Sequence, residues 1–514
     1  MRDCLLDQTL TRFGAENKQN VWNYHQGAYV CVSLKICRHL ALLATLLIVA
    51  GCAGSSTFSA YPRKIQPLIT SLTNRTPIDL ATSLESEGKS NDLIIYNMER
   101  GRYAQVVGNS DVSMADFKTS MDKIRDNDEK ALVSASGIGA NFAGTLLNDN
   151  AIPYEGDGYE RVLLHHYQAL NYLKKKDLEG AGVEVRRANA EQEQSLKRFE
   201  KEIDQAREEA EKKRVQTNSR IESQYAQMDE VAGTVKNSFQ NAYTFYVSGF
   251  IYELLNQPND AYIDYKKALE IYPHNTYLQK DVVRLATRLE MSEELERLKK
   301  RYPAQSSPFV SAPGAGSGEI LVLFEDGLVP QKKEVKIPIP ISRVGLVSIA
   351  FPVYREKWSV QIPLQIFNNN ELIGSTEPIC DIRALAVKAL REKEPVMATR
   401  QIIRAIAKGA TAAAARQSLG DLGQIAVNIW NLVSENADLR SWLTLPANAQ
   451  IMRASLPAGS YKLALQHPMS ASTSYADIEI AVGGKTVVQV TRVGGQLYTS
   501  VTPFPSAKKL VSAN

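Results

Sequence analysis

The chain has 514 residues, of which 44% are hydrophobic and 23% charged, so it is long enough for two or three domains with ordinary hydrophobic cores. Its 60 lysines and arginines almost balance its 56 aspartates and glutamates. This balance excludes the strongly basic surface that is typical of nucleic-acid binding, so we expect no nucleic-acid partner.

The first feature of the chain is a short apolar run at residues 40–50, with Lys35 and Arg38 before it and Cys52 soon after it. The run is too short for a membrane-spanning helix, which needs about 20 residues. A basic flank followed by a short apolar run is typical of an export signal. We therefore expect residues 1–51 to be a signal peptide. Its first part is longer and more mixed in charge than usual, which favours a true start near residues 30–34.

The segment Val49–Cys52 reads Val-Ala-Gly-Cys and resembles the lipobox of bacterial lipoproteins. The resemblance implies cleavage before Cys52 and lipidation of this cysteine, which would carry palmitate or similar acyl chains. Ala53 stands where inner-membrane lipoproteins usually have aspartate, so the resemblance implies the outer membrane, with the protein facing the periplasm. Residues 52–60 would be the lipidated tether. A buried apolar segment with an incidental cysteine is the alternative.

The mature protein would retain one further cysteine, Cys380, because the other three lie in the expected signal peptide. A single free thiol excludes an internal disulfide framework. Cys380 has apolar neighbours and no histidine near it in sequence, so we expect a small core residue rather than a nucleophile.

Small residues recur at equal spacings in three segments of the region 61–302, which predicts three helical hairpins. At such positions only Gly, Ala or Ser lets two helix backbones approach closely. Four residues after the middle small residue, each segment has a bulky side chain, Phe117, Val185 or Tyr265. The small residues are Gly101, Ser113, Ser120, Ala169, Ala181, Ala188, Gly249, Ala261 and Ala268.

The third segment resembles the tetratricopeptide repeat, although Ser248 replaces the leucine of that motif. The matching positions are Phe245, Gly249, Tyr252, Ala261, Tyr265, Ala268 and Pro273. The resemblance implies stacked hairpins whose concave groove accepts a helix or an extended segment of a partner. A generic helical bundle is the alternative.

Two insertions separate the three segments. The first is rich in glycine but does not match a phosphate-binding loop, so a structural loop is the simpler interpretation. The second, residues 191–235, has apolar residues at alternating steps of three and four, which favours an arm of two antiparallel helices paired as a coiled coil. A single exposed charged helix is the alternative. The candidate binding residues of the groove and the first insertion are Asn148, Asp149, Tyr154, Tyr159, Tyr172 and Tyr252.

The composition of residues 303–318 predicts a linker, and residues 319–505 a β-rich domain with a helical insertion at 382–436. Apolar runs of strand length on both sides of Gly483 and Gly484 predict a β-hairpin. The expected fold class is therefore α+β, with a helical array resembling tetratricopeptide repeats, a coiled-coil-like insertion and an antiparallel β-sandwich.

No established catalytic or metal-binding motif occurs in the sequence. Gly484, Lys485 and Thr486 imitate the end of a phosphate-binding loop, but the first glycine of that motif is missing. His165 and His166 are adjacent, so they would point to different faces of a helix and could not chelate one metal. We expect no catalytic residue, metal or cofactor, although an enzyme built from scattered carboxylates stays open.

The chain also resembles a family of bacterial outer-membrane lipoproteins with no assigned mechanism, through the segments Asn148–Asn150, Gly158–Glu160 and Val183–Ala188. Lipoproteins with helical repeats serve outer-membrane protein assembly, pilus or secretin biogenesis and activation of peptidoglycan synthases. The resemblance implies a protein–protein interaction scaffold for envelope proteins, held on the membrane by its lipid. The alternative is a periplasmic peptidoglycan- or glycan-binding protein or a cell-wall enzyme.

Overall fold

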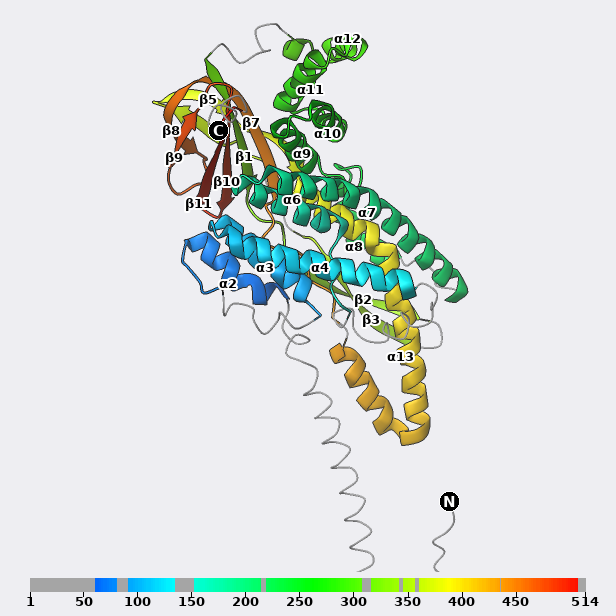
Figure 1. The fold of residues 1–514 in the computed structure, drawn as a ribbon. Helices are drawn as coiled ribbons and strands as arrows, with labels where there is room; N and C mark the ends of the chain where they lie inside the picture. The colour runs from blue at the N-terminus through cyan, green and yellow to red at the C-terminus, as the bar shows by residue number, and fades with distance from the viewer. Residues whose placement is uncertain are drawn as a thin grey trace, which may run out of the picture. The chain divides into compact units, whose positions relative to one another are not determined.

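The structure of the protein is a computed structural model, and Figure 1 shows the fold of the described residues. They are residues 61–80, 91–134, 152–213, 219–306, 316–341, 345–355, 360–434 and 436–506. The signal peptide, the tether with Cys52 and the candidates Asn148 and Asp149 lie outside them. Helices precede a set of sheets, so the predicted α+β class is confirmed. Within the described ranges, no helix is long and apolar enough to cross a bilayer.

The helices of the first part pair as hairpins that follow one another in space as they do in the chain (Figure 1). The second helix of each hairpin also packs on the first helix of the next. The helices are α2 (Tyr61–Asn74), α3 (Leu93–Val106), α4 (Ser110–Ser134), α6 (Gly158–Lys174), α7 (Leu178–Lys213), α8 (Ser219–Ala232), α9 (Ala242–Leu254), α10 (Pro258–Ile271), α11 (Thr276–Arg288), α12 (Ser292–Arg301) and α13 (Ile382–Ser434). The pairs α3–α4, α6–α7, α9–α10 and α11–α12 therefore form a stack.

The small residues lie where the paired helices cross, and all nine are buried. A Cβ added to Gly101 would lie 2.6 Å from the ring of Phe117, and one added to Gly249 would lie 2.7 Å from the ring of Tyr265. The aromatic ring of one helix thus occupies the space that a missing side chain leaves on the other. This packing explains why a small residue and a bulky residue recur together.

The strands form three sheets in the described part of the chain. They are β1 (Ser317–Asp326), β2 (Lys333–Ile341), β3 (Gly345–Val353), β4 (Gln365–Asn368), β5 (Glu371–Ser375), β6 (Glu377–Asp381), β7 (Asn448–Pro457), β8 (Gly459–Gln466), β9 (Ser474–Ile480), β10 (Lys485–Val493) and β11 (Gln496–Phe504). The central sheet has the order β11-β10-β1-β7-β6, and a second sheet has the order β5-β4-β8-β9. Strands β2 and β3 pair only with each other. Strand β1 runs parallel to β10, so the central sheet is mixed and not, as the sequence predicted, antiparallel throughout.

The central sheet is buried on both faces, which explains the continuous apolar run in β1. Ile320, Val322 and Phe324 belong to a core shared with the four-stranded sheet. Leu321 and Leu323 belong to the larger core that contains the helices. The helices and the four-stranded sheet therefore pack on opposite faces of the central sheet.

The 3-10 helix η5 (Pro303–Ser306) and the start of β1 lie at the two ends of the predicted linker.

The predicted hairpin at Gly483 and Gly484 is wrong, because the two strands that flank it belong to different sheets. Strand β9 pairs with β8, whereas β10 pairs with β1 and β11. The turn is held by β1 instead: the Gly483 N–H donates to the Ser317 carbonyl at 2.8 Å, and the Glu319 N–H donates to the Gly484 carbonyl at 2.9 Å. The alternating apolar residues would be buried equally well whether the two strands paired with each other or with other strands. The apolar pattern alone therefore did not distinguish these two pairings.

The predicted coiled-coil pairing within residues 191–235 is also wrong. Helices α7 and α8 exist, but α7 packs mainly on α6 and also on α13 and α9, whereas α8 packs mainly on α13, which runs beside it (Figure 1). The buried residues of α8 contact the β2–β3 hairpin: the Tyr225 hydroxyl donates to the Pro352 carbonyl at 2.9 Å, and its ring lies edge-on to Phe351. The apolar stripe was real, but its partner lies more than a hundred residues further along the chain.

Candidate functional site

The face of the hairpins that should form an open groove is covered by the chain itself. Tyr154 and Tyr159 are buried, and both hydroxyls bond to Glu160. Tyr252 is 7% exposed, and Tyr172 is half-buried against Gly180. The four described candidates are therefore packing residues, and none of them faces an open groove.

A backbone segment after α13 occupies the inner face of the first two hairpins. The N–H groups of Leu443 and Thr444 donate to Glu99 of α3 at 2.6 and 2.9 Å. The N–H of Trp442 donates to Glu160 of α6 at 2.7 Å. The fully buried ring of Trp442 lies edge-on to Phe117 and Tyr167. The hairpins thus hold their own C-terminal part as a repeat array would hold a bound peptide.

The two glutamates of this contact have perturbed acidities. Burial raises the pKa of Glu99 to about 7, although the N–H groups of Leu443 and Thr444 and the Tyr61 hydroxyl all act to lower it. Burial and the nearby charge of Asp157 raise the pKa of Glu160. Such shifts often mark catalytic acids. Here each carboxylate is bonded to backbone N–H groups of the packed segment, so we assign both glutamates a structural role.

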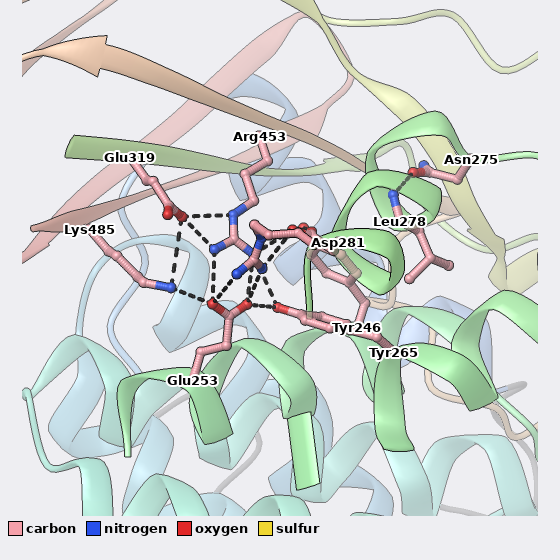
Figure 2. Close-up of polar contacts among 10 residues, drawn as sticks. Tyr246, Glu253, Tyr265, Asn275, Leu278, Asp281, Glu319, Arg453 and Lys485 are labelled. Carbon is pink, nitrogen blue, oxygen red and sulfur yellow. Dashed lines mark hydrogen bonds and ion pairs between the residues drawn. The ribbon is translucent and has the colours of Figure 1, made fainter. Parts of the chain in front are cut away.

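The third hairpin is joined to the central sheet by a buried network of ion pairs, which Figure 2 shows. Arg453 of β7 contacts Glu253 of α9 at 2.9 Å and Asp281 of α11 at 3.0 Å, and it also pairs with Glu319 of β1. Lys485 of β10 lies 2.6 Å from Glu253. Five separate elements therefore meet in one cluster.

The cluster is balanced in charge, because Arg284 adds a third cation at 2.7 Å from Glu253. Burial alone would raise the pKa of Glu253, but the charges of Arg453, Arg284 and Lys485 outweigh it and hold the pKa well below its ordinary value. The same competition lowers the pKa of Glu319 to about 2. Three acids are thus paired with three bases, and removal of any one of them would leave a buried charge without compensation.

Each of the three predicted hairpins has a further polar contact that the sequence analysis missed. The residue before Phe117, Val185 and Tyr265 is always acidic and buried. Arg100 donates to Asp116 at 2.8 Å, His165 lies 2.7 Å from Glu184, and Ser248 donates to Asp264 at 2.5 Å. Aligning the three segments on their small residues would have revealed this acidic column.

One cavity of about 730 Å³ remains beside the first hairpin, and it is the best candidate for a ligand site. It is lined by the segment after α2, by α3, the α3–α4 turn and α6, and by β1, β10 and β11. The charged residues of its lining are Arg75, Asp79, Arg102, Lys174 and Glu325. Its uncharged polar residues include Asn109, Gln489, Thr491, Thr499 and Ser500. None of these lining residues belongs to a motif that predicted a binding site.

Arg102 is the most buried cation of the cavity, with 3% exposure. Its guanidinium pairs with Glu325, donates to Gln105 at 2.7 Å and lies 4.1 Å from the centre of the Tyr167 ring. Among the described residues, its Nε–H has no acceptor, and the buried hydroxyl of Thr499 has no hydrogen-bond partner. Two polar groups of the cavity wall thus have unused bonding capacity.

The described residues contain no group of three or more His, Cys, Asp or Glu side chains placed to hold a metal ion. Comparisons with family models, with curated proteins and with solved structures find no match to this chain. The functional conclusion therefore depends on the residues of the chain itself.

Proposed function

We propose that this protein is an outer-membrane lipoprotein that faces the periplasm and acts as a protein–protein interaction scaffold in cell-envelope assembly. The lipobox-like segment Val49–Cys52 supports the lipid anchor. The stacked hairpins support a tetratricopeptide-like array, and the two sheets that share a core support a β-sandwich. Because the inner face of the array is occupied, the partner binds elsewhere on the molecule.

The observation that carries this proposal is an exposed apolar stripe across the outer face of the four-stranded sheet. Leu372 of β5 is paired with Phe367 of β4, which is paired with Ala464 of β8, which is paired with Tyr475 of β9. Directly paired residues point to the same face of a sheet, so the four side chains form one row. Leu372 is 51% exposed and Tyr475 60% exposed.

The surroundings of the stripe favour a protein as its occupant. The row has the bulky Leu372 and Tyr475 at its ends and the small Ala464 between Phe367 and Tyr475. Lys462 and Asp477 are paired in the neighbouring row and offer one charge of each sign at the rim. An apolar centre with a polar rim is the usual build of a protein interface. The proposed occupant is thus a segment of an envelope protein with apolar side chains.

Site-specific photo-crosslinking tests the scaffold in cells that make the full chain. A photoreactive residue at position 475 should give a discrete protein adduct. Leu372→Asp should abolish the adduct, because it places a charge within the stripe. Ile263→Asp is the matched control, since Ile263 is 50% exposed on α10, far from the stripe in sequence, and should leave the adduct unchanged. An adduct that survives Leu372→Asp, or no adduct at all, would contradict the proposal.

The second candidate function is binding of peptidoglycan or another glycan, or a cell-wall enzyme activity. Of these, the cavity beside the first hairpin favours glycan binding. Hydroxyl and amide groups on its wall are suited to a hydroxylated ligand. Retention of the purified protein on isolated peptidoglycan, without other proteins, would favour this function. If the protein is not retained on peptidoglycan, the interaction scaffold is the one candidate function that remains.

A further inference from the structure

Strand β9 carries two exposed acids beside the apolar stripe on the outer face of the four-stranded sheet. Tyr475, Asp477 and Glu479 are exposed and alternate with buried residues, so their side chains all lie on this outer face. The inner face packs on the central sheet. Figure 1 shows β8 and β9 on the side of the molecule away from helices α6 and α7. The acids and the stripe therefore form one continuous exposed surface.

The charges of the two acids are not neutralised by nearby bases. In the part of the chain that the structure describes, neither Asp477 nor Glu479 forms an ion pair or a side-chain hydrogen bond. Strands β8 and β9 contain one basic residue, Lys462, whose ammonium group lies 5.3 Å from the centre of the Tyr475 ring. Two acids against one base leave this surface negative, although the whole chain has a net charge of +4.

The charges stand on one side of the stripe only. The neighbouring row on that side pairs Lys462 with Asp477, and Glu479 follows in the next row. The row on the other side consists of Gln466, Gln365 and Ser375, which are uncharged. A partner that fits this surface therefore has apolar side chains with basic residues on one side of them.

The spacing of the exposed residues on β9 fits a helix. Alternate residues of a strand lie about 7 Å apart, so Asp477 and Glu479 follow Tyr475 at about 7 and 14 Å. Residues four apart in an α-helix lie about 6 Å apart along its axis, so successive turns of a helix laid along β9 would meet these three side chains in turn. A helix also satisfies its own backbone hydrogen bonds, which an extended segment lying across the face of a sheet does not.

We propose that this surface binds an amphipathic helix of an envelope protein, with apolar side chains over the stripe and Lys or Arg one and two turns further, over Asp477 and Glu479. The proposal rests on the interaction scaffold proposed above and names the chemistry of its partner. A second copy of this chain would bring the same two acids to the contact, and an anionic lipid surface would be repelled by them, so both fit less well.

Photo-crosslinking from position 475, in outer-membrane fractions that contain the full chain, tests the charge of the partner. The double variant Asp477→Asn/Glu479→Gln should lower the yield of the protein adduct about threefold to tenfold. A rise in NaCl from about 50 to about 500 mM should lower the wild-type yield in the same direction, because salt screens exposed charges. Lys462→Gln should not lower the yield, since it removes a charge that repels a basic partner.

Glu293→Gln/Glu296→Gln is the matched control for the double variant. It makes the same change in net charge at two exposed acids of α12, outside the four-stranded sheet. Its adduct yield should equal that of the wild type.

The sequence of the crosslinked peptide, determined by mass spectrometry, tests the helix. We expect Lys or Arg at three or four and at seven or eight positions from the crosslinked residue, on one side of it. Asp477→Lys should abolish the adduct, and exchange of the matching partner residue for Glu should restore it.

The proposal is overturned if the double variant crosslinks as the wild type does, if Lys462→Gln lowers the yield as much as the double variant, or if the crosslinked peptide lacks these basic residues. An adduct with a second copy of this chain or with a lipid overturns it as well. An adduct that Leu372→Asp abolishes but that the acidic positions do not affect keeps the scaffold and removes the basic helix as its partner. The absence of any adduct contradicts the scaffold itself, so the two failures are distinguishable.

Discussion

Gly249 of α9 lies against the ring of Tyr265 of α10, so that a Cβ at position 249 would be 2.7 Å from two ring carbons. The ring is fully buried and its hydroxyl donates to Glu253 at 2.8 Å, so it has no free space to move into. Over-packing of this kind costs about 1–3 kcal/mol, and the higher helix propensity of alanine recovers at most about 1 kcal/mol.

We therefore predict that Gly249→Ala lowers the free energy of unfolding by about 1–2 kcal/mol, measured by urea denaturation. Gly495→Ala is the control, because the nearest atom to its added Cβ would be at 3.4 Å and its stability should hardly change. Equal stability of Gly249→Ala and the wild type would contradict the close crossing.

The second prediction concerns the network around Arg453, which has 8% side-chain exposure. Arg453→Met removes the central cation and leaves Glu253 and Asp281 buried with less compensation. Loss of one member of a buried ion pair costs about 3–5 kcal/mol, so the urea midpoint should fall strongly.

Arg297→Met is the control for this network, since the side chain of Arg297 is 74% exposed and its ion pairs lie on the surface. The urea midpoint of Arg297→Met should equal that of the wild type. If Arg453→Met were as stable as the wild type, the network would not join the third hairpin to the sheet.

The third prediction is a pH dependence that originates in Glu99. Its ordinary pKa is 4.5, and burial raises the pKa to about 7 in the folded protein. Between these values the native state keeps a proton that the unfolded state has released, so the free energy of unfolding falls as pH rises through this window and remains lower above it. The fall due to this group is at most about 3 kcal/mol.

The glutamine in Glu99→Gln does not titrate. Between pH 5 and 8, the free energy of unfolding of this variant should therefore fall less than that of the wild type, as measured by the urea midpoints. Glu296→Gln, at a side chain that is 65% exposed, should follow the wild-type curve. Parallel curves for Glu99→Gln and the wild type would show that Glu99 is ionised throughout.

The fourth prediction concerns the anchor. Cys52→Ser should abolish incorporation of labelled palmitate, because the thiol is the expected site of acylation. Cys380→Ser should label as the wild type does, since Cys380 is buried and burial raises the pKa of its thiol. Persistent labelling of Cys52→Ser would overturn the lipoprotein assignment.

Local patterns predicted the elements whose packing depends on neighbouring residues in the sequence. The spacing of Gly101, Ser113 and Ser120 with Phe117 reflects one helix crossing another within a hairpin, and the structure has that hairpin. The apolar run of β1 likewise reflects burial on both faces of one strand.

Contacts between distant segments were not predictable in the same way. The apolar face of α8 predicts that another element covers it, but that α13 and the β2–β3 hairpin do so depends on how the whole chain folds. The predicted groove depended on distant contacts in the same way. Tyr154 and Tyr159 belong to a residue type that is common in binding surfaces, but both side chains are buried, and their hydroxyls bond to Glu160.

The parallel pairing of β1 with β10 has a consequence for the order in which the protein is assembled. The hairpins from α3 to α10 are made first, but the segment at Trp442 that packs on α6, and Arg453 and Lys485 that pair with Glu253 of α9, are made later. Contacts between segments this far apart form slowly, and apolar surface stays open to unwanted association while they form. Lys485 of β10 can reach Glu253 of α9 only after most of the chain has been made, so this contact between the third hairpin and the central sheet is completed late.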